Sequence, residues 1–153
     1  MLSAILAILI IITVIIILPM KTDKELQEEH PELYNVAREG GTEPAGSSDL
    51  LHADEEGMFR CAVCNAALFA GETKFDSGSG WPSFTDPISK DAVILIEDNT
   101  HGMKRTEVQC ANCQAHLGHV FPDGPKRAGD ADKDFGRHDR YCLNGICLDH
   151  QAT

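Results

Sequence analysis

Basic residues are scarce in this chain of 153 amino acids. Lysine and arginine together number 13, against 24 aspartates and glutamates, so the formal net charge is −11. No window interleaves basic residues with aromatic ones. Because a general nucleic-acid binder presents a basic surface to the phosphates, this composition excludes that class of protein. The acidic balance mainly favours solubility.

Long amphipathic helices are also missing from the part of the chain after Glu39. Short apolar stretches occur there instead, separated by glycine, proline and aspartate, a pattern typical of antiparallel β structure. Strands are predicted over residues 58–61, 73–75, 93–97, 107–110, 117–121 and 140–143. The expected fold class is therefore mainly β, in one domain with appendages. Residues 125–139 are expected to form a solvated loop.

Two short helices are expected before these strands. Thr22-x-x-Glu25 has the spacing of a capping box, which marks the start of a helix. Pro31 suits the first turn of a second helix, and Gly40 suits its C-terminal end. The polar composition predicts a helical stalk over residues 21–33, leading into a domain over residues 34–153.

Residues 2–18 form a long apolar run with only mild polar breaks. At a rise of about 1.5 Å per residue, a helix of this length just crosses a hydrocarbon core of about 30 Å. No lysine or arginine precedes the run, and Pro19-Met20-Lys21 is a poor small-residue cleavage site. We therefore expect an uncleaved transmembrane anchor over residues 1–20, with a cleaved signal peptide as the alternative.

The charges beside this run bear on its orientation. Lys21 and Lys24 follow the run and nothing basic precedes it, which favours a cytoplasmic domain. Asp23 and Glu25 surround these lysines and weaken that indication. We therefore expect a single-pass membrane protein, and the charges weakly favour a catalytic domain on the cytoplasmic side.

Four of the six cysteines form two widely separated pairs, Cys61-Ala-Val-Cys64 and Cys110-Ala-Asn-Cys113. Two such pairs supply the four thiolates that tetrahedral Zn²⁺ prefers, so the spacing predicts a structural zinc site. The alternatives are two disulfides or four reduced thiols in the core. A redox-active pair is disfavoured, because no thioredoxin-like βαβ pattern surrounds either one.

Cys142 stands outside these pairs, in the segment Arg140-Tyr-Cys-Leu-Asn144. A guanidinium nearby favours the thiolate, which is the form of cysteine that attacks electrophiles. Residues two apart on a strand share a face, so we expect Arg140 and Asn144 beside Cys142. The alternatives are a surface ion pair for Arg140 and a turn residue for Asn144.

The motifs, taken in order, resemble those of the B-type methionine sulfoxide reductases, which are methionine-R-sulfoxide reductases. They are Cys61-x-x-Cys64, Lys74-Phe-Asp-Ser-Gly-Ser-Gly-Trp-Pro-Ser-Phe84, Cys110-x-x-Cys113, His116-Leu-Gly-His-Val-Phe-Pro-Asp-Gly124 and Arg140-Tyr-Cys-Leu-Asn144. The likeness runs from about Tyr34 to Leu148. It implies two small antiparallel sheets, a structural zinc away from the active site, and reduction of the R-epimer of methionine sulfoxide.

The resemblance also implies roles for single residues. Cys142 would be the nucleophile and would be left as a sulfenic acid. His116 and His119 would line the site, with His119 the closer candidate for proton donor, unless one histidine merely holds the other. Trp81 would form the pocket for the substrate's methyl group, with Phe84 as a weaker second wall. The amide of Asn144 would hold a water or the oxyanion.

One departure from the family concerns recycling of the enzyme. Many members carry a second cysteine where Ser79 stands, and a serine cannot form a disulfide with Cys142. Cys147 is the remaining thiol, although an odd separation on a regular strand places it on the opposite face from Cys142. Otherwise thioredoxin or another thiol reduces the sulfenic acid. The expected partners are therefore oxidised methionine, free or in proteins, and a thiol reductant, with the protein a monomer.

Two other function classes remain open at this point. A zinc-stabilised β module can bind a ligand without turnover, because fold alone does not determine function. A thiol-exchange protein using one cysteine pair is the third possibility, and it would keep its fold after chelation. Cys142, His119 and Trp81 together favour the enzyme, because a binding module has no need of an activated thiol.

Overall fold

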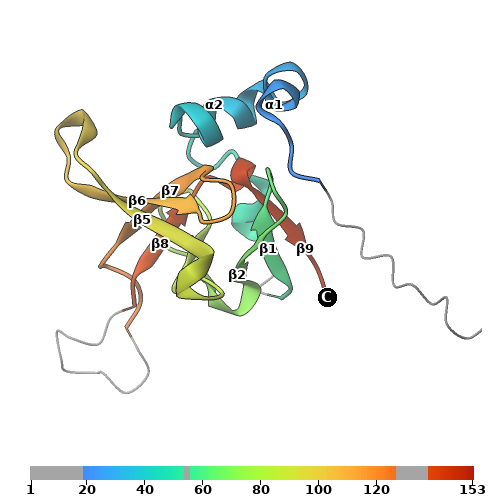
Figure 1. Cartoon of the computed structure of the whole chain (residues 1–153). Coiled ribbons are helices and arrows are strands. Elements are labelled where there is room, and N and C mark those ends of the chain that lie inside the picture. Colours follow the sequence, from blue (N-terminus) through green and yellow to red (C-terminus); the bar gives the residue numbers. More distant parts are fainter. Residues whose placement is uncertain (1–18, 54–55, 127–137) are drawn as a thin grey trace, which may run out of the picture.

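Two antiparallel sheets carry the fold in the computed structural model, which describes residues 19–53, 56–126 and 138–153 (Figure 1). The smaller sheet has the order β2-β1-β9, with β1 (Met58–Cys61), β2 (Ala67–Ala70) and β9 (Leu148–Gln151). The larger sheet has the order β3-β4-β8-β7-β6-β5. Its strands are β3 (Lys74–Phe75), β4 (Ser83–Phe84), β5 (Val93–Asp98), β6 (Arg105–Cys110), β7 (His116–Phe121) and β8 (Arg140–Leu143). The prediction of a mainly β fold with two antiparallel sheets is confirmed.

Short 3₁₀ turns join several of these strands. They are η1 (Asp49–His52), η2 (Gly71–Thr73), η3 (Lys90–Ala92), η4 (Thr100–Gly102) and η5 (Gly145–Cys147). The last of them, η5, directly follows the strand that carries Cys142 and leads into β9. It therefore connects the larger sheet to the smaller one.

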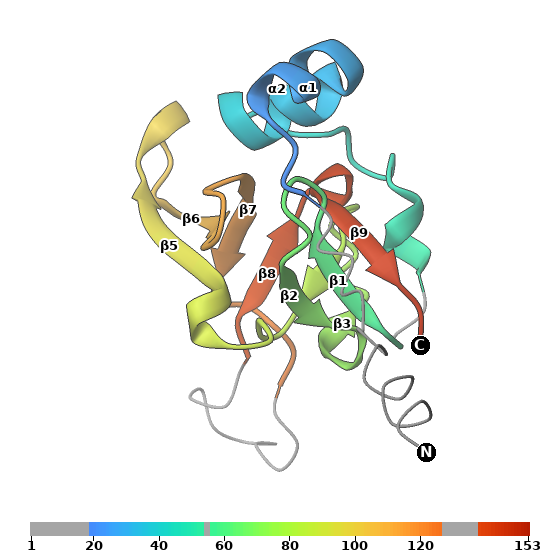
Figure 2. The same cartoon turned by 45° about the vertical axis from the view of Figure 1, so that its right-hand side comes forward.

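Two helices, α1 (Asp23–Glu29) and α2 (Pro31–Glu39), lie on one side of the sheets in both views (Figures 1 and 2). The predicted capping box is present: the backbone N–H of Thr22 donates to the Glu25 carboxylate at 2.7 Å, and the Glu25 N–H donates to the Thr22 hydroxyl at 3.2 Å. Gly40 ends α2 with a φ of 70°, a conformation that suits glycine. Leu26 of α1 is fully buried in the core. The predicted boundary between stalk and domain stays a prediction.

Three phenylalanines from both sheets form the centre of the core. Phe84 of β4 lies with its ring centroid 4.9 Å from that of Phe59 on β1 and 4.7 Å from that of Phe69 on β2. All three are fully buried. Burying a side chain of this size stabilises the fold by about 1.5–3 kcal/mol. These contacts join the two sheets into one core.

None of the helices among the described residues is long and apolar enough to cross a membrane. The helices α1 and α2 have 7 and 9 residues, whereas a span needs about 20 apolar residues in a row. The transmembrane helix predicted before the domain is therefore corrected, and with it the expected single-pass membrane location. Residues 1–18, on which most of that prediction rested, lie outside the described residues, as does most of the predicted loop over 125–139.

Candidate active site and cysteine cluster

The larger sheet brings Cys142 and His119 directly opposite each other on neighbouring strands. Ser83 of β4 pairs with Cys142 of β8, and Cys142 pairs with His119 of β7. Opposite residues of antiparallel strands point to the same face, so these side chains share one side of the sheet. Gly118 lies so close to β8 that a Cβ atom there would overlap the carbonyl oxygen of Cys142. Glycine at this position therefore allows the close approach of the two strands.

A cavity of about 130 Å³ lies beside the Cys142 thiol. Its lining consists of Thr42, Trp81, Arg105, Gly118, His119, Phe121, Cys142, Leu143 and Asn144. Four of the predicted site residues, Trp81, His119, Cys142 and Asn144, thus meet around one space. Phe84 does not line it and lies in the core instead, so the second aromatic side chain of the cavity is Phe121.

A row of hydrogen-bonded hydroxyl groups ends at the sulfur of Cys142. The Ser79 hydroxyl lies 3.7 Å from the Cys142 sulfur, within hydrogen-bond range for sulfur. Ser77 extends this hydrogen-bonded row, because its hydroxyl lies 2.7 Å from that of Ser79 and 2.7 Å from that of Ser83. A row of hydroxyls at this spacing can stabilise a negative charge on the sulfur.

Arg140 lies at the edge of the site and is held by Asp123. Its Nε and Nη2 donate to the two carboxylate oxygens of Asp123 at 2.8 and 3.1 Å, and its guanidinium lies 4.4 Å from the ring centre of Phe121. These bonds to Asp123 raise the pKa of Arg140, and the interaction with Cys142 raises it further. The predicted neighbourhood of Arg140 and Cys142 is thus present, with Asp123 as the stronger partner.

Asp98 holds two groups at the opposite end of the cavity. Its Oδ2 lies 2.7 Å from Nε2 of His119 and accepts a hydrogen bond from Nη2 of Arg105 at 3.1 Å. Hydrogen bonds from Thr100 and His119 lower the pKa of Asp98, so the carboxylate is ionised and Nε2 of His119 carries the proton between them. Among the described residues, the buried Nε of Arg105 has no hydrogen-bond partner.

The protonation of His119 follows from opposing effects. Burial lowers its pKa below the ordinary 6.5, and the positive charge of Arg105 acts in the same direction. The hydrogen bond to Asp98 raises the pKa by a smaller amount. His119 is therefore neutral at pH 7, with a proton on Nε2 and a free lone pair on Nδ1.

His116 lies behind His119 and does not line the cavity. Its Nδ1 is 2.7 Å from Oε1 of Glu107, and its ring centre is 5.5 Å from that of His119 at an interplanar angle of 67°. His116 is 6% exposed. Its position fits the alternative that one histidine holds the other in place.

Glu43 connects Trp81 to the turn after Cys142. Its carbonyl oxygen accepts the indole N–H of Trp81 at 3.0 Å, and its N–H donates to Oδ1 of Asn144 at 2.9 Å. The Glu43 carboxylate accepts the backbone N–H groups of Gly145 and Ile146. The Asn144 amide also donates to the carbonyl of Leu117 at 3.0 Å, so protein groups already hold both ends of this side chain.

Cys147 lies in the turn η5 and is fully buried. Burial raises the pKa of its thiol, and the negative charges of Glu43 and Cys113 add to this effect. Its sulfur forms no disulfide in the structure. A thiol in these surroundings is a poor nucleophile.

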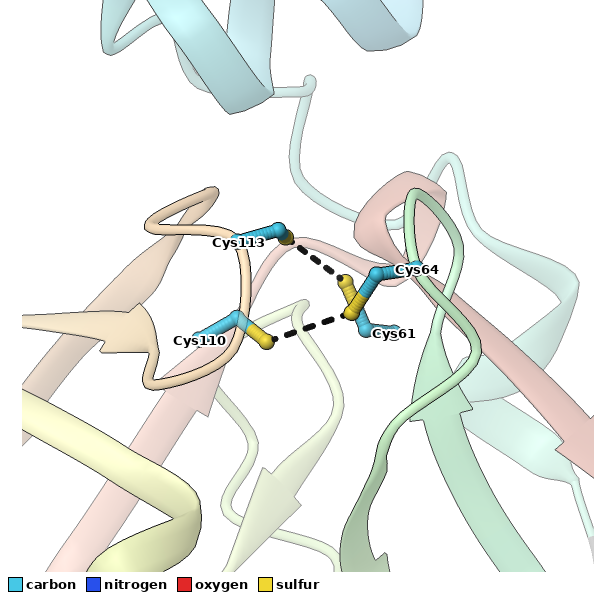
Figure 3. A group of neighbouring side chains, drawn as sticks. All are labelled: Cys61, Cys64, Cys110 and Cys113. Carbon is cyan, nitrogen blue, oxygen red and sulfur yellow. Dashed lines mark hydrogen bonds between the residues drawn. The ribbon is translucent and has the colours of Figure 1, made fainter. Parts of the chain in front are cut away.

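The other four cysteines form a cluster between the ends of β1 and β6 (Figure 3). All four sulfurs lie within 4.8 Å of one another. The sulfurs of Cys61 and Cys113 are 3.7 Å apart, and those of Cys64 and Cys110 are 3.6 Å apart. Sulfurs bound at about 2.3 Å to one tetrahedral zinc ion would lie about 3.8 Å from each other. The spacing therefore fits a single metal ion of this size.

Sequence reasoning missed the residues that hold the site from outside, chiefly Asp98, Arg105, Glu107 and Glu43. Asp98 and Arg105 face each other across the β5–β6 hairpin, so alignment of those two strands would have indicated the pair. Glu43 lies in an irregular loop and carries no pattern in its neighbouring residues. Its role depends on contacts with residues about a hundred positions away in the chain.

Comparison with known proteins adds independent evidence. The family description of the SelR domain matches residues 30–152 of this chain. The chain is also similar to the peptide methionine sulfoxide reductase MsrB of Thioalkalivibrio sulfidiphilus (strain HL-EbGR7). The two are 49% identical over 133 residues, which cover 86% of this chain and 90% of that protein.

Proposed function

The chain belongs to the methionine-R-sulfoxide reductase (MsrB) family, and we propose that Cys142 is the residue that attacks the sulfoxide sulfur. The protein is an enzyme that reduces the R-epimer of methionine sulfoxide to methionine. One observation supports the proposal most strongly: the partly buried Cys142 shares a small cavity with Trp81, His119 and Arg105. A binding module without turnover gains nothing from this arrangement, and no contact favours it.

The first step exchanges an oxygen atom between two sulfurs. Neutral His119 takes the thiol proton of Cys142 on its free Nδ1, which leaves a thiolate opposite it in the sheet. The thiolate attacks the sulfoxide sulfur and forms an S–S bond, and His119 returns the proton to the sulfoxide oxygen. The resulting hydroxyl moves to the Cys142 sulfur as the S–S bond and the original S–O bond break. Methionine leaves with its sulfur reduced by two electrons, and Cys142 becomes a sulfenic acid, oxidised by two electrons. Ser79 and Arg140 stabilise the negative charge on the attacking sulfur.

The sulfoxide oxygen needs donors on the opposite side of the cavity. Arg105 offers a buried Nε–H that no group of the described protein accepts, and a charged donor of this kind forms a strong hydrogen bond. Asp98 fixes both Arg105 and His119, so the two donors keep their positions relative to the thiol. Asn144 contributes as a positioning residue, because its amide is bound to Glu43 and Leu117.

Trp81 provides the apolar wall for the substrate's methyl group. Contacts of sulfur and methyl groups with an aromatic ring contribute about 0.3–1.5 kcal/mol. The hydrogen bond from its indole N–H to Glu43 fixes the ring. Phe121 takes the place that the sequence suggested for Phe84. This wall favours the thioether end of the substrate over a fully polar ligand.

The cysteine cluster holds a structural zinc ion under this proposal, with Cys61, Cys64, Cys110 and Cys113 as its ligands. The sulfur spacing and the all-thiolate donor set support it. The bound ion supplies stability to the fold rather than chemistry to the reaction. An external thiol, such as thioredoxin, regenerates Cys142 in two steps: one thiol displaces water from the sulfenic acid, and a second reduces the mixed disulfide.

Separated epimers of methionine sulfoxide test the proposal. With dithiothreitol as reductant, the wild type is expected to form methionine from the R-epimer only, and Cys142→Ser is expected to be at least about 1,000-fold slower because the nucleophile is gone. Cys147→Ala is the matched cysteine control and should keep turnover within about twofold, since burial keeps that thiol from the reaction. Turnover of the R-epimer by Cys142→Ser at the wild-type rate would disprove the assignment, and a folded but inactive Cys147→Ala would show that Cys147 takes part in the reaction.

A further inference from the structure

Exposed aliphatic residues gather on β5, the edge strand of the larger sheet. Ile94, Leu95 and Ile96 are 37%, 50% and 40% exposed. Within the described chain β5 pairs only with β6, and the hairpin that they form projects from the rest of the domain (Figures 1 and 2). Natural proteins usually protect such an edge with charges, because exposed apolar strands attract other chains. Charge is present only at the end of β5, at Glu97 and Asp98, so the three aliphatic neighbours before them point to contact with another polypeptide.

Two of these three residues lie on the face of the sheet that carries the active site. Ile96 pairs with Glu107 of β6, and Glu107 pairs with His119 of β7. His119 in turn pairs with Cys142 of β8. Since paired residues share a face, Ile96 lies in one row with the catalytic thiol, and Ile94 lies on the same face two positions before it.

A direct contact supports this assignment of faces. Asp98, two positions after Ile96 on β5, lies 2.7 Å from the His119 ring. Leu95 points to the opposite face, where its paired residue Val108 is fully buried. Ile94 and Ile96 are therefore exposed on the face of the sheet that carries the substrate cavity, whereas Leu95 is exposed on the other face. We call Ile94 and Ile96 the β5 rim.

The distance from the Cys142 thiol to the β5 rim determines how many residues of a bound polypeptide lie between the two. Three strand spacings separate Cys142 from Ile96, or about 14 Å at about 4.8 Å per strand. An extended polypeptide advances about 3.3 Å per residue, so about four residues cover that distance. We propose that the β5 rim binds an apolar side chain of an extended polypeptide substrate, about four residues from its methionine sulfoxide. This docking surface rests on the function proposed for Cys142.

Kinetics with two kinds of substrate test the rim. The full chain is assayed on N-acetyl-methionine-R-sulfoxide amide and on decapeptides with one methionine-R-sulfoxide and one leucine placed two, four or six residues away, the rest being serine and glycine. The wild type should show its highest kcat/KM for the spacing of four. In the double variant Ile94→Ser/Ile96→Ser that kcat/KM should fall about five- to tenfold, because the apolar contact is lost. Turnover of the small amide should stay unchanged.

The same strand provides a matched control. Leu95→Ser removes a side chain of similar size and greater exposure from the opposite face, so it should leave both substrates unaffected. Equal losses on the peptides and the small amide, or equal losses in Leu95→Ser, would overturn the proposal. A double variant with a raised KM for the thiol reductant alone would also overturn it, because the rim would then bind the reductant. So would a wild-type dimer that dissociates in the double variant, because the rim would then bind a second copy of the chain. A wild type inactive on the small amide would instead contradict the function proposed for Cys142.

Discussion

The cysteine cluster and the cavity around Cys142 place the same side chain in two different surroundings. In the cluster, four sulfurs face one another within 4.8 Å at the junction of two strands (Figure 3). In the cavity, the one sulfur of a partly buried cysteine lies beside the Ser79 hydroxyl and opposite His119 in the sheet, with a guanidinium nearby. The first arrangement suits a metal ion held permanently, and the second suits an electrophile that enters and leaves.

The two regions are linked by the strands between them. Cys110 is the last residue of β6, and β7 begins three residues after Cys113. The same two strands carry Arg105 and His119 at the cavity. Damage to the cluster should therefore remove activity through loss of the fold, whereas damage to the cavity should remove activity and leave the fold. This difference teaches that neighbours, more than residue type, decide the role of a cysteine.

Removing the cluster should have the largest effect on the protein. Cys110→Ser, or a strong zinc chelator, is expected to abolish cooperative thermal unfolding, because structural zinc sites contribute apparent free energies of about 10–16 kcal/mol at neutral pH. Circular dichroism together with metal analysis measures this. Unchanged unfolding after complete removal of metal would contradict the structural role of zinc in the cluster and favour four reduced core thiols.

Changing His119 should affect activity but not the fold. His119→Asn is expected to lower kcat/KM by about 10²–10⁴, the usual contribution of a general acid–base group. The pKa of His119 lies below the ordinary 6.5, and the neutral form that accepts the thiol proton predominates at pH values above that pKa. The wild-type rate should therefore fall as the pH drops through that value, and the variant should lack this change. His116→Asn is the control, since His116 does not line the cavity, and an equal loss there would contradict the assignment.

Changing Glu43 should have a smaller effect, limited to the cavity. Glu43→Gln removes a carboxylate that accepts two backbone N–H groups, at an expected cost of about 1–3 kcal/mol in stability. KM should rise more than kcat falls, because the Glu43 carboxylate anchors the loop whose backbone carbonyl accepts the indole N–H of Trp81. Trp81 is the chain's one tryptophan, so its fluorescence reports on the wall directly. Exposed Glu39→Gln is the control, and an unchanged emission spectrum in Glu43→Gln would show that Glu43 does not position the ring.

Local patterns predicted much of the fold. The cap at Thr22 and the end of α2 at Gly40 depend on residues a few positions apart, so the sequence indicates them directly. The predicted bounds of 58–61 and 140–143 coincide with β1 and β8. The strands β2, β4 and β9 were missed. β4 has two residues, and β9 has one apolar residue followed by three polar ones, so their strand state comes from their partners in the sheets rather than from their own composition.

The candidate site also contains residues that local motifs indicate and residues that only the tertiary structure places. Cys142, His119 and Trp81 belong to motifs that the sequence displays, and the structure brings them together. The position of Phe84 in the core could not be read from its motif, because only the packing of β1 and β2 against β4 decides it. Glu43 contacts residues distant in the chain and gives no local signal, whereas Asp98 could be indicated only by aligning β5 with β6. The predicted monomeric state and domain boundaries stay predictions.

Trapping of the oxidised intermediate identifies the cysteine that attacks the sulfoxide. The protein is treated with methionine-R-sulfoxide in the absence of any thiol, labelled with a sulfenic-acid-selective probe, and digested for mass spectrometry. Label is expected on Cys142, dependent on the R-epimer, and none is expected on Cys147 or the four cysteines of the cluster. Formation of methionine with the label on another cysteine, or with no label at all, would contradict the assignment of Cys142.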